Sequence, residues 1–179
     1  MNRQSPRPEL PIGAPIPKIT PANVLQILEG VDPSTHCGRR DRAMILMSYS
    51  GVRQGSALSA RVEDLITRKG EFWLRVRDQK VRMREKYSEM ECNPTLAQAV
   101  RAYIDCAGLL SDPKGSLFRV VSPRTDEITS RPLSVQEVHT ITRRRAREAG
   151  IEDEVNWFSI RKAGLSAYQA DQMREREAQ

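Results

Sequence analysis

The sequence predicts one mixed, mainly α-helical domain with a small antiparallel β-sheet. Several segments place apolar residues at helical spacing, and residues 71–77 alternate apolar and polar side chains in the strand period. Prolines concentrate in residues 1–19, which favours an extended segment there. We therefore expect a Pro-rich linker or tail over residues 1–19 and a single domain over residues 20–179.

The first half of the domain has the pattern of three helices. Thr20 caps the first helix, with a proline in its first turn. The second helix, residues 39–50, is apolar over most of its surface, so we expect it at the centre of the core. Gly51 ends that helix, and a short third helix is expected over residues 55–60.

A small sheet is expected next. Residues 71–77 and 87–92 have strand patterns, and the polar, basic residues 78–86 connect them. A two- or three-stranded antiparallel sheet with a long basic hairpin fits this arrangement.

The second half of the domain is again mainly helical. Capping signals open helices at Asn93 and at Ser134, where Glu137 completes a capping box. A last helix begins near Ser159, and its polar end, residues 171–179, is expected to fray.

Charge and composition limit the class of partner. The net charge is +6 and the isoelectric point is about 9.5, which favours a nucleic acid over an acidic protein as partner. No apolar run is long enough to span a bilayer, and the N-terminus lacks a signal-peptide pattern. Three widely spaced cysteines and two histidines do not form a metal motif. We expect a cytoplasmic protein without membrane contact, metal, cofactor or small-molecule substrate.

Two arginines stand in unusual surroundings. Arg53 ends an apolar stretch that begins at Ala43, and Arg161 lies between Phe158 and Gly164 in a second mostly apolar motif. Both are expected to lie against the core, where a guanidinium without an anionic partner is costly. If they converge, they form a fork for one phosphate group.

These motifs resemble the two arginine boxes of the tyrosine recombinase (phage integrase) family, over about residues 20–168. Residues 39–53 resemble the first box, residues 61–65 the segment that follows it, and residues 156–168 the second box. The resemblance implies the fold of the recombinase catalytic domain and a role in DNA integration and recombination, as in mobile genetic elements. It also implies duplex DNA and other recombinase subunits as partners.

The family's chemistry assigns roles to particular residues. In the family, a tyrosine attacks a DNA phosphodiester and forms a phosphotyrosine, with no metal or nucleotide cofactor. By resemblance, Arg53 and Arg161 hold the non-bridging oxygens, and a hairpin lysine protonates the leaving oxygen. Lys80 is favoured for that lysine, and Lys86 is the alternative and a DNA contact. The other interpretation is that both are ordinary exposed lysines.

The sequence also departs from the family. Phe158 replaces the family's histidine, and Ser56 replaces its usual acid. The sequence ends before the position of the family's nucleophile, and none of its tyrosines matches it: Tyr49, Tyr87, Tyr103 and Tyr168. Tyr168 instead matches a family core position. We expect a recombinase-like protein that is inactive as this chain, or alternatively a non-catalytic DNA-binding relic or a regulator of recombination.

An arginine-rich helix precedes the second box. Helical spacing puts Arg143, Arg144 and Arg147 near one face. This face either contacts DNA phosphates or is a solvated surface partly neutralised by Glu148 and by acidic residues 152–154.

Overall fold

The computed structural model describes residues 19–78, 86–122 and 124–177, and within these ranges it confirms the mixed, mainly helical fold. The α-helices are α1 (Pro21–Glu29), α2 (His36–Tyr49), α3 (Gln54–Ser59), α4 (Pro94–Cys106), α5 (Val135–Glu148) and α6 (Trp157–Glu177). The strands are β1 (Leu65–Arg68), β2 (Glu71–Asp78), β3 (Lys86–Glu91), β4 (Arg119–Val121) and β5 (Ile128–Pro132).

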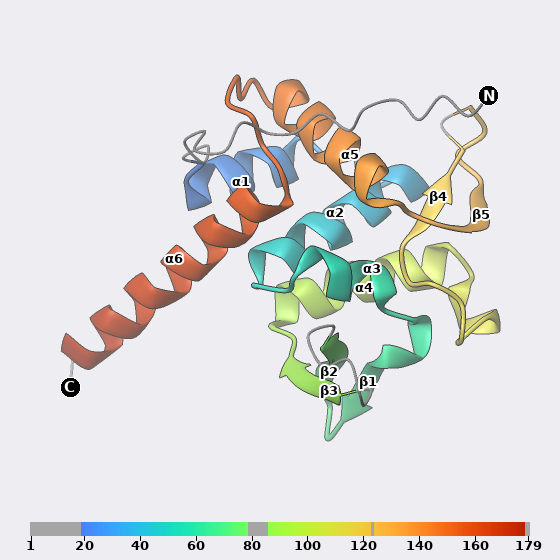
Figure 1. Cartoon of the computed structure of the whole chain (residues 1–179), viewed down its shortest axis with the longest axis horizontal. Coiled ribbons are helices and arrows are strands. Elements are labelled where there is room, and N and C mark those ends of the chain that lie inside the picture. Colours follow the sequence, from blue (N-terminus) through green and yellow to red (C-terminus); the bar gives the residue numbers. More distant parts are fainter. Residues whose placement is uncertain (1–18, 79–85, 123, 178–179) are drawn as a thin grey trace, which may run out of the picture.

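Helix α2 runs through the middle of the molecule (Figure 1). Helices α1 and α5 and the first turns of α6 lie to one side of it, and the three-stranded sheet lies on the other. The C-terminal half of α6 projects from the body. This helix continues to Glu177, so it includes the polar residues from 171 onward.

The sequence explains the central position of α2. The hydroxyl of Thr35 accepts a hydrogen bond from the Gly38 amide and caps the helix, which therefore begins three residues earlier than expected. The apolar residues from Ala43 to Met47 are all buried, as the apolar pattern predicted. Burial of these side chains is the main stabilising contribution of α2.

The same helix buries a charged cluster, which the apolar pattern did not predict. The carboxylate of Asp41 has no exposed side-chain surface. It accepts hydrogen bonds from Nε of Arg40 at 2.9 Å, Nε of Arg145 at 2.8 Å and Nη2 of Arg144 at 3.2 Å. Arg40 also donates from Nη1 to the carbonyl oxygen of Arg119 at 3.3 Å. The cluster thus joins α2 to α5 and to β4.

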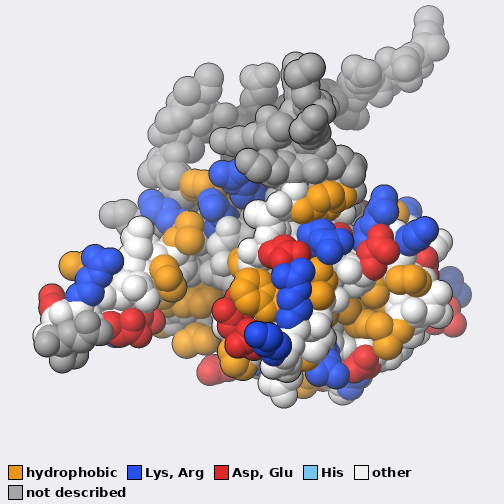
Figure 2. Space-filling model, turned by 90° about the horizontal axis from the view of Figure 1, so that it is seen from below, with side chains coloured by type: hydrophobic (Ala, Val, Ile, Leu, Met, Phe, Trp, Pro, Cys, Tyr) orange, Lys and Arg blue, Asp and Glu red, His pale blue; other side chains and the backbone are white. Residues whose placement is uncertain are grey.

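The main sheet has the strand order β1-β2-β3, with both pairs antiparallel. The third strand, left open by the sequence, is β1. Leu74 lies opposite Leu65 on one side and Met90 on the other, and it packs into the core. On the outer face, Arg68 pairs with Glu89. Figure 2 shows this side of the molecule, where basic and acidic side chains stand next to hydrophobic ones.

Strands β4 and β5 form a second, two-stranded sheet, with Val121 opposite Ile128. The sequence showed no strand pattern for β5, because its residues after Ile128 are exposed and polar or proline. Next to this sheet, both ring nitrogens of His36 face carbonyl oxygens, that of Asp126 at 2.7 Å and that of Cys106 at 3.0 Å. These contacts attach the start of α2 to the β4–β5 turn and to the end of α4.

Two further findings concern the described residues only. No helix among them combines the length and the apolar character needed to cross a membrane. In the same ranges, no group of three or more histidine, cysteine, aspartate or glutamate side chains is arranged to hold a metal ion.

The predicted capping box of α5 is confirmed. The hydroxyl of Ser134 accepts a hydrogen bond from the Glu137 amide at 3.2 Å, and the Glu137 carboxylate accepts one from the Ser134 amide at 2.9 Å. Arg131 adds a short ion pair at 2.6 Å. The hydrogen bond from Arg131, followed by that from the Ser134 amide, lowers the pKa of Glu137 to about 2.

This lowered pKa makes the stability of the fold depend on pH. A depressed carboxylate pKa stabilises the folded state above the ordinary value of 4.5, and this contribution is lost as the pH falls towards 2. Glu137→Gln should therefore lower the thermal midpoint at pH 6, and the difference from the parent should shrink between pH 4.5 and 2. Glu152→Gln, at an exposed position, is the control and should show no such convergence. A constant difference at all pH values would contradict the assignment.

Candidate phosphate-binding site

Arg53 and Arg161 lie on the wall of one cavity of about 260 Å³. We call this cavity the arginine pocket. Its lining residues are Gly51, Val52, Arg53, Ser56, Val76, Ser88, Met90 and Arg161. They come from the turn between α2 and α3, from α3 itself, from the first turns of α6 and from the inner face of β2 and β3. The structure thus brings the two arginines together at one pocket, as predicted.

The turn between α2 and α3 positions Arg53. Gly51 has φ of +90°, in the left-handed region that glycine adopts without strain, and it ends α2. Val52 is buried, and its carbonyl accepts a hydrogen bond from the indole Nε1 of Trp157 at 2.9 Å. Arg53 follows as the N-cap residue of α3. Its side chain is exposed, so the expectation that it lies against the core is wrong.

Arg161 crosses from α6 to the same turn. It is half-buried, and its Nε donates a hydrogen bond of 2.7 Å to the carbonyl oxygen of Gly51. Over residues 19–78, 86–122 and 124–177, no carboxylate lies within ion-pair distance of Arg53 or Arg161. Among the described residues, the two cations of the pocket therefore have no counter-charge, and a phosphate group fits such an arrangement.

Close packing of α6 against α2 sets the position of Arg161. Ser48 in α2 donates a hydrogen bond of 2.8 Å to the carbonyl oxygen of Trp157, the first residue of α6. Further along, Gly164 is buried so close to α2 that a Cβ atom would lie 1.7 Å from the carbonyl oxygen of Tyr49. The two backbones can approach in this way only because residue 164 has no side chain.

The remaining sequence-predicted residues are dispersed. Ser56 lines the arginine pocket, whereas Phe158 does not, and the Phe158 side chain is 51% exposed. Lys80 lies outside the described residues. Lys86 is the first residue of β3. Sequence reasoning missed Ser88 as a lining residue, although the two-residue period of a strand places it on the same face as Met90.

No tyrosine of the sequence lines the arginine pocket. Tyr103 is fully buried, and burial raises its pKa to about 12. Tyr49 and Tyr168 line a neighbouring cavity of about 550 Å³, which shares Met90 with the arginine pocket. Tyr168 is 64% exposed, so its expected core position is wrong. Tyr87 is exposed on β3, with the Arg75 guanidinium 5.8 Å from its ring centre.

The arginine-rich helix is α5. Arg144 contacts buried Asp41 at 3.2 Å, and Arg143 lies 3.8 Å from Glu154. Arg147 is exposed, and no acidic side chain of the described residues lies within ion-pair distance of it. Part of this basic face is thus neutralised within the protein, and Arg147 is its least neutralised member.

Comparison with known proteins supports one family. The model described as "Phage integrase family" matches residues 17–179. No curated protein matches the chain. Among solved structures, XerA recombinase has a TM-score of 0.68 and 19% identity, over 92% of this chain and 53% of that one.

XerH site-specific recombinase bound to its difH substrate before cleavage has a TM-score of 0.63 and 16% identity, over 86% of this chain and 42% of that one. The XerH post-cleavage complex with palindromic difH has a TM-score of 0.58 and 15% identity, over 82% of this chain and 40% of that one. At these identities the likeness shows a shared fold. The chain spans about half the length of these recombinases or less.

Proposed function

This chain belongs to the phage integrase family, and from that premise we propose that it binds duplex DNA and holds one backbone phosphate between Arg53 and Arg161. The observation that carries the proposal is the arginine pocket, where both arginines meet without an acidic partner among the described residues. XerH, which has the same fold, is bound to a DNA substrate in its structure, and this supports a DNA partner here.

The chemistry of the pocket follows from its two guanidinium groups. Each can donate paired hydrogen bonds to the non-bridging oxygens of a phosphodiester, where negative charge accumulates when the phosphorus is attacked. The Nε of Arg161 is already used by Gly51, so this arginine would offer its terminal nitrogens to the phosphate. Lys80 remains our proposed proton donor, with Lys86 the alternative. Arg147, and more weakly Arg143 and Arg144, would contact flanking phosphates.

We further propose that this chain by itself occupies DNA without cleaving it, as a relic or a regulator of recombination would. The positions of the tyrosines support this, because each of the four lies outside the arginine pocket. Phe158, at the family's histidine position, has no atom that can donate a hydrogen bond to a phosphate or transfer a proton.

Absence of cleavage gives a direct test. A nicked suicide substrate incubated with the chain should yield no covalent protein–DNA adduct on a denaturing gel, because orientation of a nucleophile contributes about 7–11 kcal/mol to such reactions. A full recombinase assayed in parallel shows that the substrate is competent. An adduct that disappears in Tyr168→Phe or Tyr87→Phe would overturn the proposal and identify a relocated nucleophile.

Binding itself should depend on salt and on both arginines. We expect a dissociation constant on the order of micromolar at moderate salt, measured by fluorescence anisotropy, which weakens steeply as salt rises. In Arg53→Gln/Arg161→Gln, the magnitude of the slope of log K against log salt should fall by about 0.9, since the two arginines share one phosphate and each lost phosphate contact removes about 0.9.

Arg174→Gln/Arg176→Gln removes the same charge from the exposed end of α6 and is the matched control. Its slope should stay near that of the parent chain. Equal slopes for the two double variants would exclude the arginine pocket as a phosphate contact. Affinity that does not change with salt would exclude DNA binding through phosphates altogether.

A further inference from the structure

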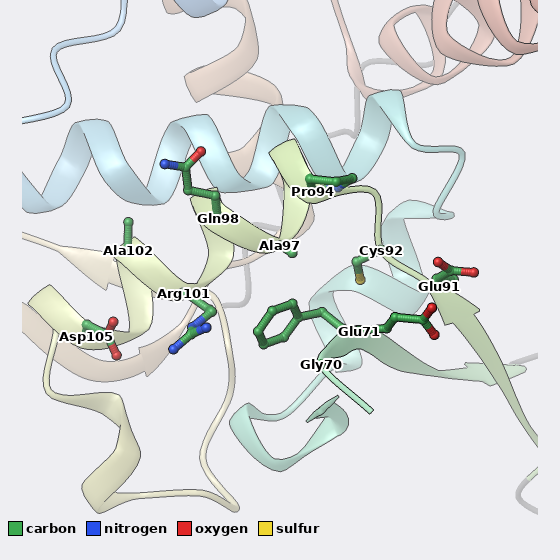
Figure 3. Close-up of a pocket in the computed structure, with 11 residues that line it drawn as sticks. Gly70, Glu71, Glu91, Cys92, Pro94, Ala97, Gln98, Arg101, Ala102 and Asp105 are labelled. Atoms are coloured by element: carbon green, nitrogen blue, oxygen red, sulfur yellow. The ribbon is translucent and has the colours of Figure 1, made fainter. Parts of the chain in front are cut away.

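A second cavity, of about 540 Å³, lies between α4 and the end of the main sheet, away from the arginine pocket (Figure 3). We call it the acidic pocket. Phe72 lines it, whereas Val76 on the same strand lines the arginine pocket. These residues are four apart on β2, about 13 Å along the strand, and the two cavities share no lining residue. The acidic pocket is therefore a distinct site.

The floor of the acidic pocket is apolar and rigidly held. Cys92 and Ala97 are buried members of the core, and Phe72 packs against that core. The guanidinium of Arg101 lies 4.8 Å from the centre of the Phe72 ring, a cation–π contact that fixes both side chains. Burial raises the pKa of the Cys92 thiol to about 11, so the thiol is neutral and contributes to the floor as an apolar group.

The rim carries an excess of negative charge. Glu71, Glu91 and Asp105 line the pocket, and within the described residues none of them forms an ion pair. In Figure 3 the carboxylates of Glu71 and Glu91 lie at one end of the pocket, and Asp105 and Arg101 lie at the other. Three carboxylates around one arginine are unusual in a chain whose net charge is +6.

This charge excludes DNA as the occupant and selects a cation. Unpaired carboxylates repel backbone phosphates, so the pocket cannot extend the DNA-binding surface. A lysine or arginine side chain between Glu71 and Glu91 would complement the local charge, and a neighbouring apolar side chain would cover Phe72 and Ala97. At the other end, Arg101 can donate to a carbonyl oxygen of a bound backbone.

We infer that the acidic pocket is a docking site for a basic peptide segment of a partner protein, with an apolar residue beside its lysine or arginine. The inference rests on an apolar floor that is flanked by carboxylates. These carboxylates have no partners among the described residues, and the chain is otherwise basic. The site does not use Arg53 or Arg161, so it can be occupied while the chain holds DNA.

The test uses an acetylated, amidated tetrapeptide of sequence leucine-arginine-leucine-lysine. A second tetrapeptide, with glutamine at both basic positions, is the neutral probe. NMR titration of the full chain should shift the amides of Gly70, Ala97 and Ala102 with the basic peptide. The neutral peptide should bind at least about tenfold more weakly, a difference of about 1.4 kcal/mol.

Two charge-matched variants test whether the peptide binds at the acidic pocket. Glu71→Lys/Glu91→Lys should weaken peptide binding at least about tenfold, whereas Glu152→Lys/Asp153→Lys, which raises the net charge equally at exposed positions, should leave it unchanged. If the first variant does not fold, Glu71→Gln/Glu91→Gln replaces it. Equal binding of both peptides, amide shifts elsewhere, or no binding at millimolar peptide would overturn the inference. Self-association of the chain that is lost in Glu71→Lys/Glu91→Lys would also overturn it, by assigning the pocket to a second copy.

Discussion

Asp41→Asn should lower the free energy of unfolding by about 3–5 kcal/mol, the usual cost of removing one member of a buried charged cluster. Asparagine has the same shape as aspartate, so the loss does not come from a cavity. It leaves Arg40 and Arg145 with an amide in place of the carboxylate that they contact at 2.9 and 2.8 Å. Because Arg40 is buried, water cannot replace the missing charge. Urea unfolding followed by circular dichroism measures the effect.

Glu148→Gln is the matched control for Asp41→Asn. Glu148 also contacts Arg145 at 2.8 Å, but its side chain is 45% exposed, so its loss should cost less than about 1 kcal/mol. Adding Arg145→Gln to Asp41→Asn should destabilise less than the sum of the two single changes, because the second change removes a charge that the first leaves without its main counter-charge. If Asp41→Asn and Glu148→Gln were equally stable, the cluster would not hold α5 onto α2.

Gly164→Ala should destabilise the fold by about 2–3 kcal/mol, although alanine is the better helix former in isolation. The added Cβ would lie 1.7 Å from the carbonyl oxygen of Tyr49, and its other neighbours are also backbone atoms of Tyr49, so α6 must move away from α2. That movement would also displace Arg161, which lies less than one helical turn before Gly164. We therefore expect a lower urea midpoint together with weaker DNA binding.

Ser166→Ala controls for helix propensity, because Ser166 is exposed on the same helix. This change should leave both stability and DNA binding within about 0.5 kcal/mol of the parent. A Gly164→Ala protein as stable as Ser166→Ala would show that the two helices can separate without cost, contrary to the close contact in the structure.

The features that the sequence predicted are those encoded within a few neighbouring residues. The capping box of Ser134 and Glu137, the end of α2 at Gly51 and the alternation of β2 are local patterns, and all three are found. Convergence of Arg53 and Arg161 depends on the whole fold, and it was predicted only because the two motifs resemble those of one family. Their roles at the phosphate remain predictions.

The features that the sequence did not predict depend on packing between distant elements. Arg144 was grouped with exposed arginines, yet it reaches Asp41, 103 residues away in the chain. Asp41 lies among arginines near the start of α2, and nothing in this local sequence shows that its carboxylate is buried. Tyr168 was expected in the core by resemblance, but α6 projects from the body there and leaves it exposed. Lys80 falls outside the described residues, so its role stays a prediction.

The hydrogen bond between Arg161 and Gly51 has a consequence for folding. The groups that it joins are 110 residues apart, so this contact forms only when α6 is docked against the turn after α2. The two guanidinium groups come together only in molecules in which α6 is docked. A polyanion that binds the assembled pair binds the native state and not its precursors, and it therefore stabilises the fold by mass action. DNA would in this way stabilise the molecules in which α6 is already docked.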